Sequence, residues 1–67
     1  ATFKLRDVAE HVEVRMYNKS GVLMATWEFS NEQVFEVFIG EFPDDQYFFH
    51  VFADGEMKIS KIVKKGK

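Results

Sequence analysis

The sequence predicts an α+β domain, with an antiparallel sheet of about four strands and one short helix in the order β-β-α-β-β. Three observations support this prediction. Apolar and polar residues alternate from His11 to Tyr17, as in a half-buried strand. A helix-start pattern at Ser30 precedes an apolar run that stops at Gly40. Two further strand-like runs flank Asp54-Gly55, which favours a two-residue hairpin turn.

The first hairpin is expected to turn at Asn18-Lys19-Ser20-Gly21, since Asn favours the start of a type I turn and Gly accepts a positive φ at its end. Val22 to Phe29 is the predicted return strand, and Thr2 to Leu5 is a candidate for an additional short strand. Pairing Tyr17 with Val22 gathers the apolar side chains of both strands on one face. The facing pairs would be Met16 with Leu23, Val14 with Ala25, and Val12 with Trp27.

A helix is predicted from Asn31 to Ile39, because Ser30 and Gln33 match a capping box and Gly40 is a typical stop. A helix this short is unstable alone and must pack on the sheet. On a helical wheel the centre of the apolar side and its edge are occupied by different residues. The centre holds Val34, Val37 and Phe38, and the edge holds Phe35 and Ile39 beside Glu32 and Glu36.

The carboxyl-terminal third is expected to form a second hairpin. Gln46 to Ala53 is a strand with apolar side chains on both faces, and it should therefore be covered on both sides. Glu56 to Val63 is a lysine-rich last strand, and lysine commonly protects an exposed sheet edge. Residues 64–67 are predicted to be a frayed basic tail.

Length and composition predict a single domain over residues 1–67 that buries only about 60% of its unfolded surface. The chain has no cysteine, and neither His11 nor His50 has metal-motif spacing, so no disulfide, metal or cofactor is expected. Eight Phe, two Tyr and one Trp exceed what a small interior holds, which favours a homodimer or a partner interface. No membrane span or signal peptide is recognisable, so we expect a soluble, cytoplasmic protein without membrane contact.

The charges are segregated. Six acids and no cation lie between Glu28 and Asp45, interspersed with large apolar residues, whereas the rest of the chain has nine Lys and Arg against five acids. An anionic surface with exposed aromatic rings is suited to imitating a nucleic acid, with carboxylates in place of phosphates. The alternative is a solvated acidic helix face with no binding role.

Residues suited to catalysis are not grouped in the sequence. Ser20 falls in a turn, Ser30 at a helix cap and Ser60 in a strand, and His50 is expected to be a hydrogen-bonded structural residue. We therefore expect a protein that is not an enzyme.

Direct nucleic-acid binding is a competing hypothesis. Lys58, Lys61, Lys64, Lys65 and Lys67, with Phe48 and Phe52 on a neighbouring strand, resemble in composition a stacking platform for single strands. The isoelectric point of about 5.6 argues against it, since nucleic-acid binders are usually basic.

The run Phe35-Glu36-Val37-Phe38-Ile39-Gly40, followed by Asp44-Asp45, resembles the centre of the small uracil-DNA glycosylase inhibitors of Bacillus-infecting short-tailed phages. In that family too, a hairpin leads into a short helix that carries Phe-Glu-Val and closes on Gly. Trp27-Glu28-Phe29 is similar to an aromatic-Glu-aromatic step in the family's second strand. The resemblance covers Val12 to Tyr47 and needs a small gap between hairpin and helix.

The resemblance implies a dimeric, non-enzymatic inhibitor that occupies the DNA-binding groove of uracil-DNA glycosylase by DNA mimicry. Phe35 would help to capture the apolar residue that the enzyme pushes into the duplex, and Glu36 and Glu28 would replace phosphates. Ile39 stands where the family has an aromatic residue, and core packing is the alternative role for Phe35. The predicted partner-binding residues are Glu28, Glu32, Phe35, Glu36, Ile39 and Glu41. The alternatives are a small single-stranded nucleic-acid-binding protein and a small homodimeric regulator of another host protein.

Overall fold

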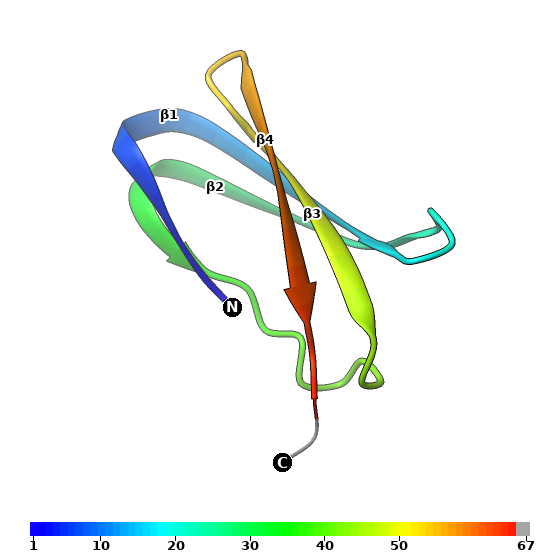
Figure 1. The fold of residues 1–67 in the computed structure, drawn as a ribbon. Helices are drawn as coiled ribbons and strands as arrows, with labels where there is room; N and C mark the ends of the chain where they lie inside the picture. The colour runs from blue at the N-terminus through cyan, green and yellow to red at the C-terminus, as the bar shows by residue number, and fades with distance from the viewer. Residues whose placement is uncertain (66–67) are drawn as a thin grey trace.

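The computed structural model describes residues 1–65 as one antiparallel sheet of four strands (Figure 1). The strands are β1 (Thr2–Asn18), β2 (Leu23–Glu36), β3 (Gln46–Ala53) and β4 (Glu56–Val63). Their order is β2-β1-β3-β4, so β1 and β3 are central and β2 and β4 form the edges. The predicted α+β class is therefore wrong: residues 1–65 are all-β and contain no helix, and so no helix able to cross a membrane.

The second hairpin is confirmed, because β3 and β4 have the predicted bounds. Its turn residues, Asp54 and Gly55, have φ of 48° and 88°. Two positive φ values are the requirement of a type I′ turn, whose twist matches that of the flanking strands. The Asp54 carboxylate also accepts hydrogen bonds from the backbone N–H groups of Glu10 and His11, both at 3.0 Å, which joins this turn to β1.

The first hairpin is confirmed as well, but its register differs from the prediction by two residues. Met16 faces Ala25 rather than Leu23. Leu23 instead faces Tyr17, which leaves Met24 as an extra residue in a bulge. Because the shift is even, Ala25 and Trp27 still share one face with the apolar side chains of β1, whereas Leu23 lies on the opposite face beside Tyr17.

Strands β1 and β2 bend together, and Figure 1 shows the ribbon folding back toward the N-terminus. The bend is marked by a break in register: Lys4 faces Val34, but the next facing pair is Ala9 with Glu32. Residues 5–8 of β1 therefore lie opposite a single residue of β2, Gln33. The surplus lets the first part of β1 and the last part of β2 turn over one face of the sheet.

The residues predicted to start the helix make this bend instead. The side-chain amide of Gln33 donates to the carbonyl oxygens of Leu5 and Arg6 at 3.2 and 3.1 Å. Asn31 has a φ of 56°, a left-handed conformation that Asn tolerates better than most residues. The Gln33 side chain thus satisfies backbone acceptors in the stretch of β1 that has lost its facing residues.

The residues predicted to form the rest of the helix extend β2 to Glu36 and pair with the start of β1. Burial alternates with a period of two: Phe35 and Val37 are buried, and Val34, Glu36 and Phe38 are exposed. Aromatic and β-branched side chains favour an extended chain. The pairing continues one step further, since Ala1 and Val37 exchange two hydrogen bonds of 2.8 and 2.9 Å.

The core lies between the sheet and the folded-back ends of β1 and β2. We call the sheet face that points into this core the inner face, and the opposite side the outer face. Phe3 and Phe35, from the folded-back ends, stack at 5.6 Å between ring centroids, and Phe3 lies 5.4 Å from Phe49 of β3. The buried residues are Ala9, Val12, Val14, Met16, Phe35, Val37, Tyr47, Phe49 and Val51.

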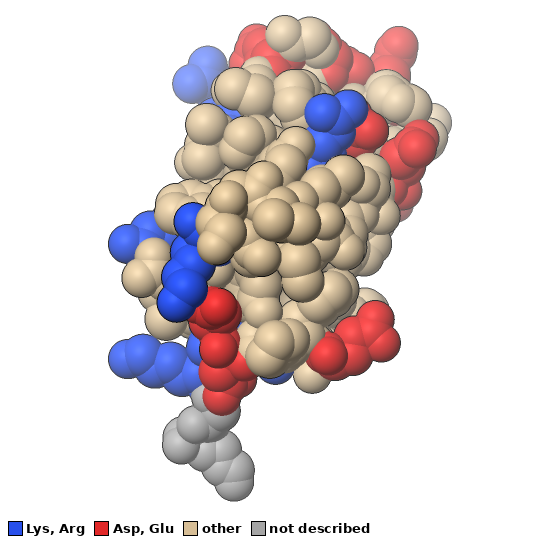
Figure 2. All heavy atoms as spheres, turned by 90° about the vertical axis from the view of Figure 1, so that its right-hand side faces the viewer, with Lys and Arg blue, Asp and Glu red and all other residues tan. Residues whose placement is uncertain are grey.

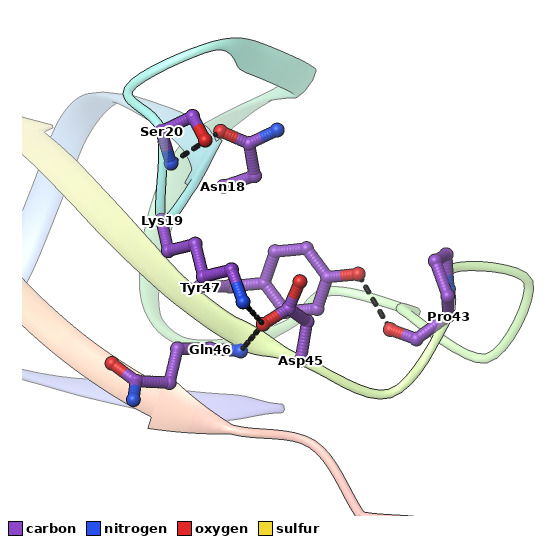
Figure 3. Close-up of polar contacts among 7 residues, drawn as sticks. All are labelled: Asn18, Lys19, Ser20, Pro43, Asp45, Gln46 and Tyr47. Carbon is purple, nitrogen blue, oxygen red and sulfur yellow. Dashed lines mark hydrogen bonds and ion pairs between the residues drawn. The ribbon is translucent and has the colours of Figure 1, made fainter.

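The connection from β2 to β3 is held to the body by polar contacts (Figure 3). The Tyr47 hydroxyl donates to the carbonyl oxygen of Pro43 at 2.5 Å, and Lys19 pairs with Asp45 at 3.7 Å. Burial, followed by the charges of Asp45 and Asp44, raises the pKa of Tyr47 above its ordinary value. These contacts explain why an irregular, acidic segment can pack against the sheet.

The start of the predicted basic tail also takes part in this packing. The Lys64 ammonium donates to the carbonyl oxygens of Phe42 and Gly40. The backbone N–H of Lys64 donates to the carbonyl oxygen of Asp45 at 2.8 Å. Lys64 is therefore not frayed. Residues 66–67 of the predicted tail lie outside the described part of the chain.

Candidate functional site

The outer face of the sheet carries three rows of side chains that run across the strands. The pairing register fixes which residues share a row. In the order β2, β1, β3, β4, the first row is Leu23, Tyr17, Phe48 and Lys61; the second is Thr26, Arg15, His50 and Ile59; and the third is Glu28, Glu13, Phe52 and Met57. We call these rows the platform.

Four rings occupy the two central strands of the platform: Tyr17 on β1, and Phe48, His50 and Phe52 on β3. The rings of Tyr17 and His50 lie 4.6 Å apart and are tilted by 49°. None of the four belongs to the buried core. The platform therefore offers partly exposed aromatic surface on the best-supported strands of the sheet.

Two cations lie among these rings. Lys61 faces Phe48, and Arg15 faces His50. The guanidinium of Arg15 also lies over the ring of Phe52, with its central carbon 5.1 Å from the ring centroid, and it pairs with Glu13 at 3.3 Å. The Tyr17 side chain and then the Glu13 charge raise the pKa of Arg15, so this guanidinium stays charged.

Nothing in residues 1–65 covers the platform. Ile59 and Met57 are 58% and 51% exposed, although both are large and apolar. Figure 2 shows the molecule from the right-hand side of Figure 1, and a broad uncharged area lies there with cations and acids around its border. Exposed apolar surface rimmed by charge is typical of a binding site.

The predicted partner-binding residues do not form the predicted recess. Glu28 belongs to the third row of the platform, Glu32 lies at the bend opposite Ala9, and Glu36 lies on the folded-back end of β2 opposite Thr2. Glu41 is exposed in the connection between β2 and β3. These acids are thus spread along an edge strand and a loop.

The apolar members of that set are corrected more strongly. Phe35 is only 4% exposed and stacks on Phe29 at 4.8 Å, so it packs in the core and is not available to a partner. Ile39 is half-buried against the same core. The ring that does stand out is Phe38, which is 75% exposed beside Glu36. The predicted helix placed Phe38 toward the core and Phe35 at the exposed edge, whereas the strand alternates its side chains with a period of two. This difference in repeat explains why Phe38 is exposed and Phe35 is buried.

Candidate catalytic residues are not brought together. Ser30 faces His11 on the edge pair β2–β1, whereas Ser60 faces Phe49 on the inner side. His50 rests against Tyr17 on the platform. Among residues 1–65 there is no group of three or more His, Asp or Glu placed to hold a metal ion.

The lysines that the sequence suggested for binding single strands do not lie on one face of the sheet. Lys61 lies on the outer face beside Phe48, but Lys58 faces Val51 and so lies on the inner side. Lys58 helps to line an open hollow beside the β1 bend, together with Arg6, Asp7 and Asp54. Lys67 lies outside the described residues.

Sequence reasoning identified Phe48, Phe52 and Lys61 as possible ligand contacts, took His50 for a structural residue, and missed Tyr17 and Arg15. The alternation in His11 to Tyr17 already placed these two side chains away from the core. What the sequence lacked was the order of the strands, which sets β1 directly beside β3. The expectation that β3 is covered on both sides holds for its inner face only.

Comparison with known proteins gives no relative: no family model matches the chain, and no curated protein or solved structure is similar enough to indicate one. The resemblance to glycosylase inhibitors therefore stays a prediction.

Proposed function

We propose that this protein is a non-enzymatic binding protein whose outer sheet face binds single-stranded nucleic acid. The observation that carries the proposal is the platform itself: four rings on the two central strands, with Arg15 and Lys61 among them. Bases stack on aromatic side chains and on guanidinium planes, and cations near the rings attract the phosphates. Flat sheets with exposed aromatic residues are a common support for unpaired bases.

The net charge of −2 opposes binding to a polyanion, but its distribution matters more than its sum. Of the acids, Glu13 and Glu28 lie on the platform, both in the third row. Glu13 is paired with Arg15 at 3.3 Å. The first two rows therefore carry cations and no acid, and they are the part of the platform that suits phosphates.

A second copy of the chain is the other occupant that an apolar sheet face suggests. Burying the platform in a dry interface would desolvate the Arg15–Glu13 ion pair and the His50 ring near its centre. The desolvation of an ion pair commonly exceeds the attraction between its charges. Nucleic acid instead uses Arg15 and His50, and this favours it over self-association.

The proposal is tested by the fluorescence anisotropy of a labelled single-stranded DNA of mixed sequence. We expect binding at low salt that weakens steeply as salt rises. Phe48→Ala should weaken it by roughly 5- to 150-fold, since stacking contributes about 1–3 kcal/mol per base. The matched control is Phe38→Ala, which removes an exposed ring elsewhere and should bind normally.

Light scattering on the same samples decides between the two occupants. A monomer that binds the DNA supports the proposal. A stable dimer that binds no DNA, and that Phe48→Ala dissociates, would assign the platform to a second copy. Trp27 lies on the inner face, 6.4 Å from Phe49, so its fluorescence reports whether each variant is folded.

The second candidate function is inhibition of uracil-DNA glycosylase by an anionic surface. What supports it is the exposed Phe38 beside Glu36, which together offer a ring and a carboxylate to a cationic groove. In this form of the hypothesis Phe38 takes the role that the resemblance gave to Phe35. Uracil excision measured with the wild-type chain and with Phe38→Ala tests it: an equal rate with and without protein excludes inhibition.

A further inference from the structure

We infer that the platform holds three consecutive bases of an extended, unstacked strand and therefore prefers pyrimidine-rich sequences. This inference rests on the proposed function and adds the class of sequence that is bound. It follows from the spacing of the rings, the position of the charges and the chemistry of base stacking.

The ring spacing comes from the strand geometry. Phe48, His50 and Phe52 are alternate residues of β3 on one face, so the Cα atoms that carry successive rings are about 6.8 Å apart. Bases in a stacked strand follow one another at about 3.4 Å. One base on each ring therefore requires neighbouring bases to be separated to about twice their stacked distance. The platform selects a strand whose bases no longer stack on each other.

That separation discriminates between bases. Purines have the larger aromatic surface and stack on one another more strongly, so pulling them apart opposes binding more than it does for pyrimidines. Preferences of single-strand binders for pyrimidine runs arise from stacking strength and backbone flexibility rather than from hydrogen bonds to base edges. The groups of the first two rows that could read base edges without a fixed charge are few, namely the Tyr17 and Thr26 hydroxyls and the His50 ring, so stacking dominates the selection.

The charges limit the length of the bound segment. Lys61 lies in the first row beside Phe48, where it can meet the phosphate that follows the first base. In the third row, Glu13 and Glu28 face each other and repel a further phosphate. The third base stacks on the Arg15 guanidinium that already lies over Phe52. The site thus closes after three bases.

The experiment compares unlabelled oligonucleotides as competitors of one labelled probe at low salt. Octamers of thymidine and of deoxyadenosine carry the same number of phosphates, so a difference between them reports the bases. We expect thymidine octamers to bind about 5- to 10-fold more tightly. In a series of thymidine oligonucleotides, affinity should rise steeply up to three nucleotides and only slightly beyond.

Two variants sharpen the comparison. His50→Ala removes the middle ring and should weaken thymidine octamers about 10-fold while reducing the preference over deoxyadenosine, because neighbouring bases are then no longer held apart on adjacent rings. Phe38→Ala leaves both affinities unchanged. Trp27 fluorescence confirms that each variant is folded.

The outcomes separate the inference from the proposed function. If no oligonucleotide binds at low salt, the proposed function fails and the inference fails with it. If deoxyadenosine octamers bind as tightly as thymidine octamers, or if affinity keeps rising steeply beyond three nucleotides, the inference is overturned while nucleic-acid binding stands. Tighter thymidine binding that levels off at three nucleotides supports both.

Discussion

Two strand segments of this protein have nearly the same composition but present very different surfaces. The segment from Val34 to Phe38 and the segment from Phe48 to Phe52 both alternate large apolar residues, and in both every second side chain enters the core. β3 is central, with β1 and β4 on either side, whereas the end of β2 pairs only with the start of β1 at an edge. Because β3 is central, its outward rings are flanked by other strands and form part of the platform. Because the end of β2 lies at an edge, it presents only the ring of Phe38.

Charge makes the same contrast. The platform holds Arg15 and Lys61 in its first two rows, but the folded-back end of β2 offers Glu36 and no cation among its own residues. The platform therefore suits an anionic partner, whereas the folded-back surface carries one charge of each sign, Glu36 and, opposite Val34, Lys4. Substitutions of these rings and charges test whether each lies on the side that this contrast assigns to it.

The largest effect is expected at Phe35. Phe35→Ala should lower the free energy of unfolding by about 3–5 kcal/mol, because the ring is buried against Phe3 and Phe29. Phe38→Ala should change it by no more than about 0.5 kcal/mol, because that ring is exposed. Urea unfolding followed by Trp27 fluorescence measures both.

A domain of this size has a total stability of only about 3–10 kcal/mol, so Phe35→Ala could prevent folding altogether. Phe35→Leu is then the informative variant, since it keeps an apolar side chain and should lose less. If Phe38 variants lose more stability than Phe35 variants, the segment is turned the other way, as the predicted helix required.

The exchange of Phe35 and Phe38 shows which part of the fold the sequence did not predict. The turns at Gly21 and Asp54-Gly55 are local signals, and both were predicted correctly together with the bounds of β3 and β4. The segment from Asn31 to Ile39 is different, because its apolar residues satisfy both a helical repeat and a strand repeat. The choice between them depends on pairing with Thr2 to Lys4, about thirty residues away along the chain.

The candidate site divides in the same way. Phe48, Phe52 and Lys61 could be named from two consecutive strands joined by a short turn. Tyr17 and Arg15 could not be added, because the crossover that sets β1 beside β3 is a property of the whole sheet. The sequence therefore predicted site residues on strands that are consecutive in the chain, but not those that depend on which distant strands lie side by side.

A second prediction concerns the acidic connection, whose packing depends on Tyr47. Its pKa is raised in the folded protein by burial and by Asp45 and Asp44, so the folded state holds this proton more tightly than the unfolded state does. The resulting stability is fully present below the ordinary tyrosine pKa of about 10 and is lost as pH rises through the folded value. Urea midpoints between about pH 8 and 11 should therefore fall with pH, and less so in Tyr47→Phe.

Tyr17 and the lysines are common to both proteins, so the difference between wild type and Tyr47→Phe isolates Tyr47. Parallel curves for the two proteins would mean that the Tyr47 hydroxyl is not protected in the folded state, and that the connection is not held as described.

A third prediction uses two lysines of one strand that point to opposite faces. Lys61→Ala should weaken single-stranded DNA binding several-fold and reduce the salt slope of affinity by about one, the effect of losing one phosphate contact. Lys58→Ala removes the same charge from the inner side of β4 and should leave both quantities nearly unchanged. Equal effects of the two variants would contradict a face-specific site and point to net charge alone.

The smallest effect, and the one that separates the two surfaces most directly, is expected at Glu28. Glu28 faces Glu13 in the third row, and like charges directly opposite each other destabilise a sheet. Glu28→Gln should therefore raise stability slightly and tighten DNA binding about two-fold, because it removes a carboxylate that repels phosphate.

Glu36→Gln, on the same strand beyond the bend, removes an equal charge from the other surface and should leave DNA affinity unchanged. Titrations of the two variants at the same low salt give the comparison. Tightening by Glu28→Gln alone would locate the bound strand on the outer face, whereas equal tightening by both would mean that the DNA responds only to the total charge of the protein.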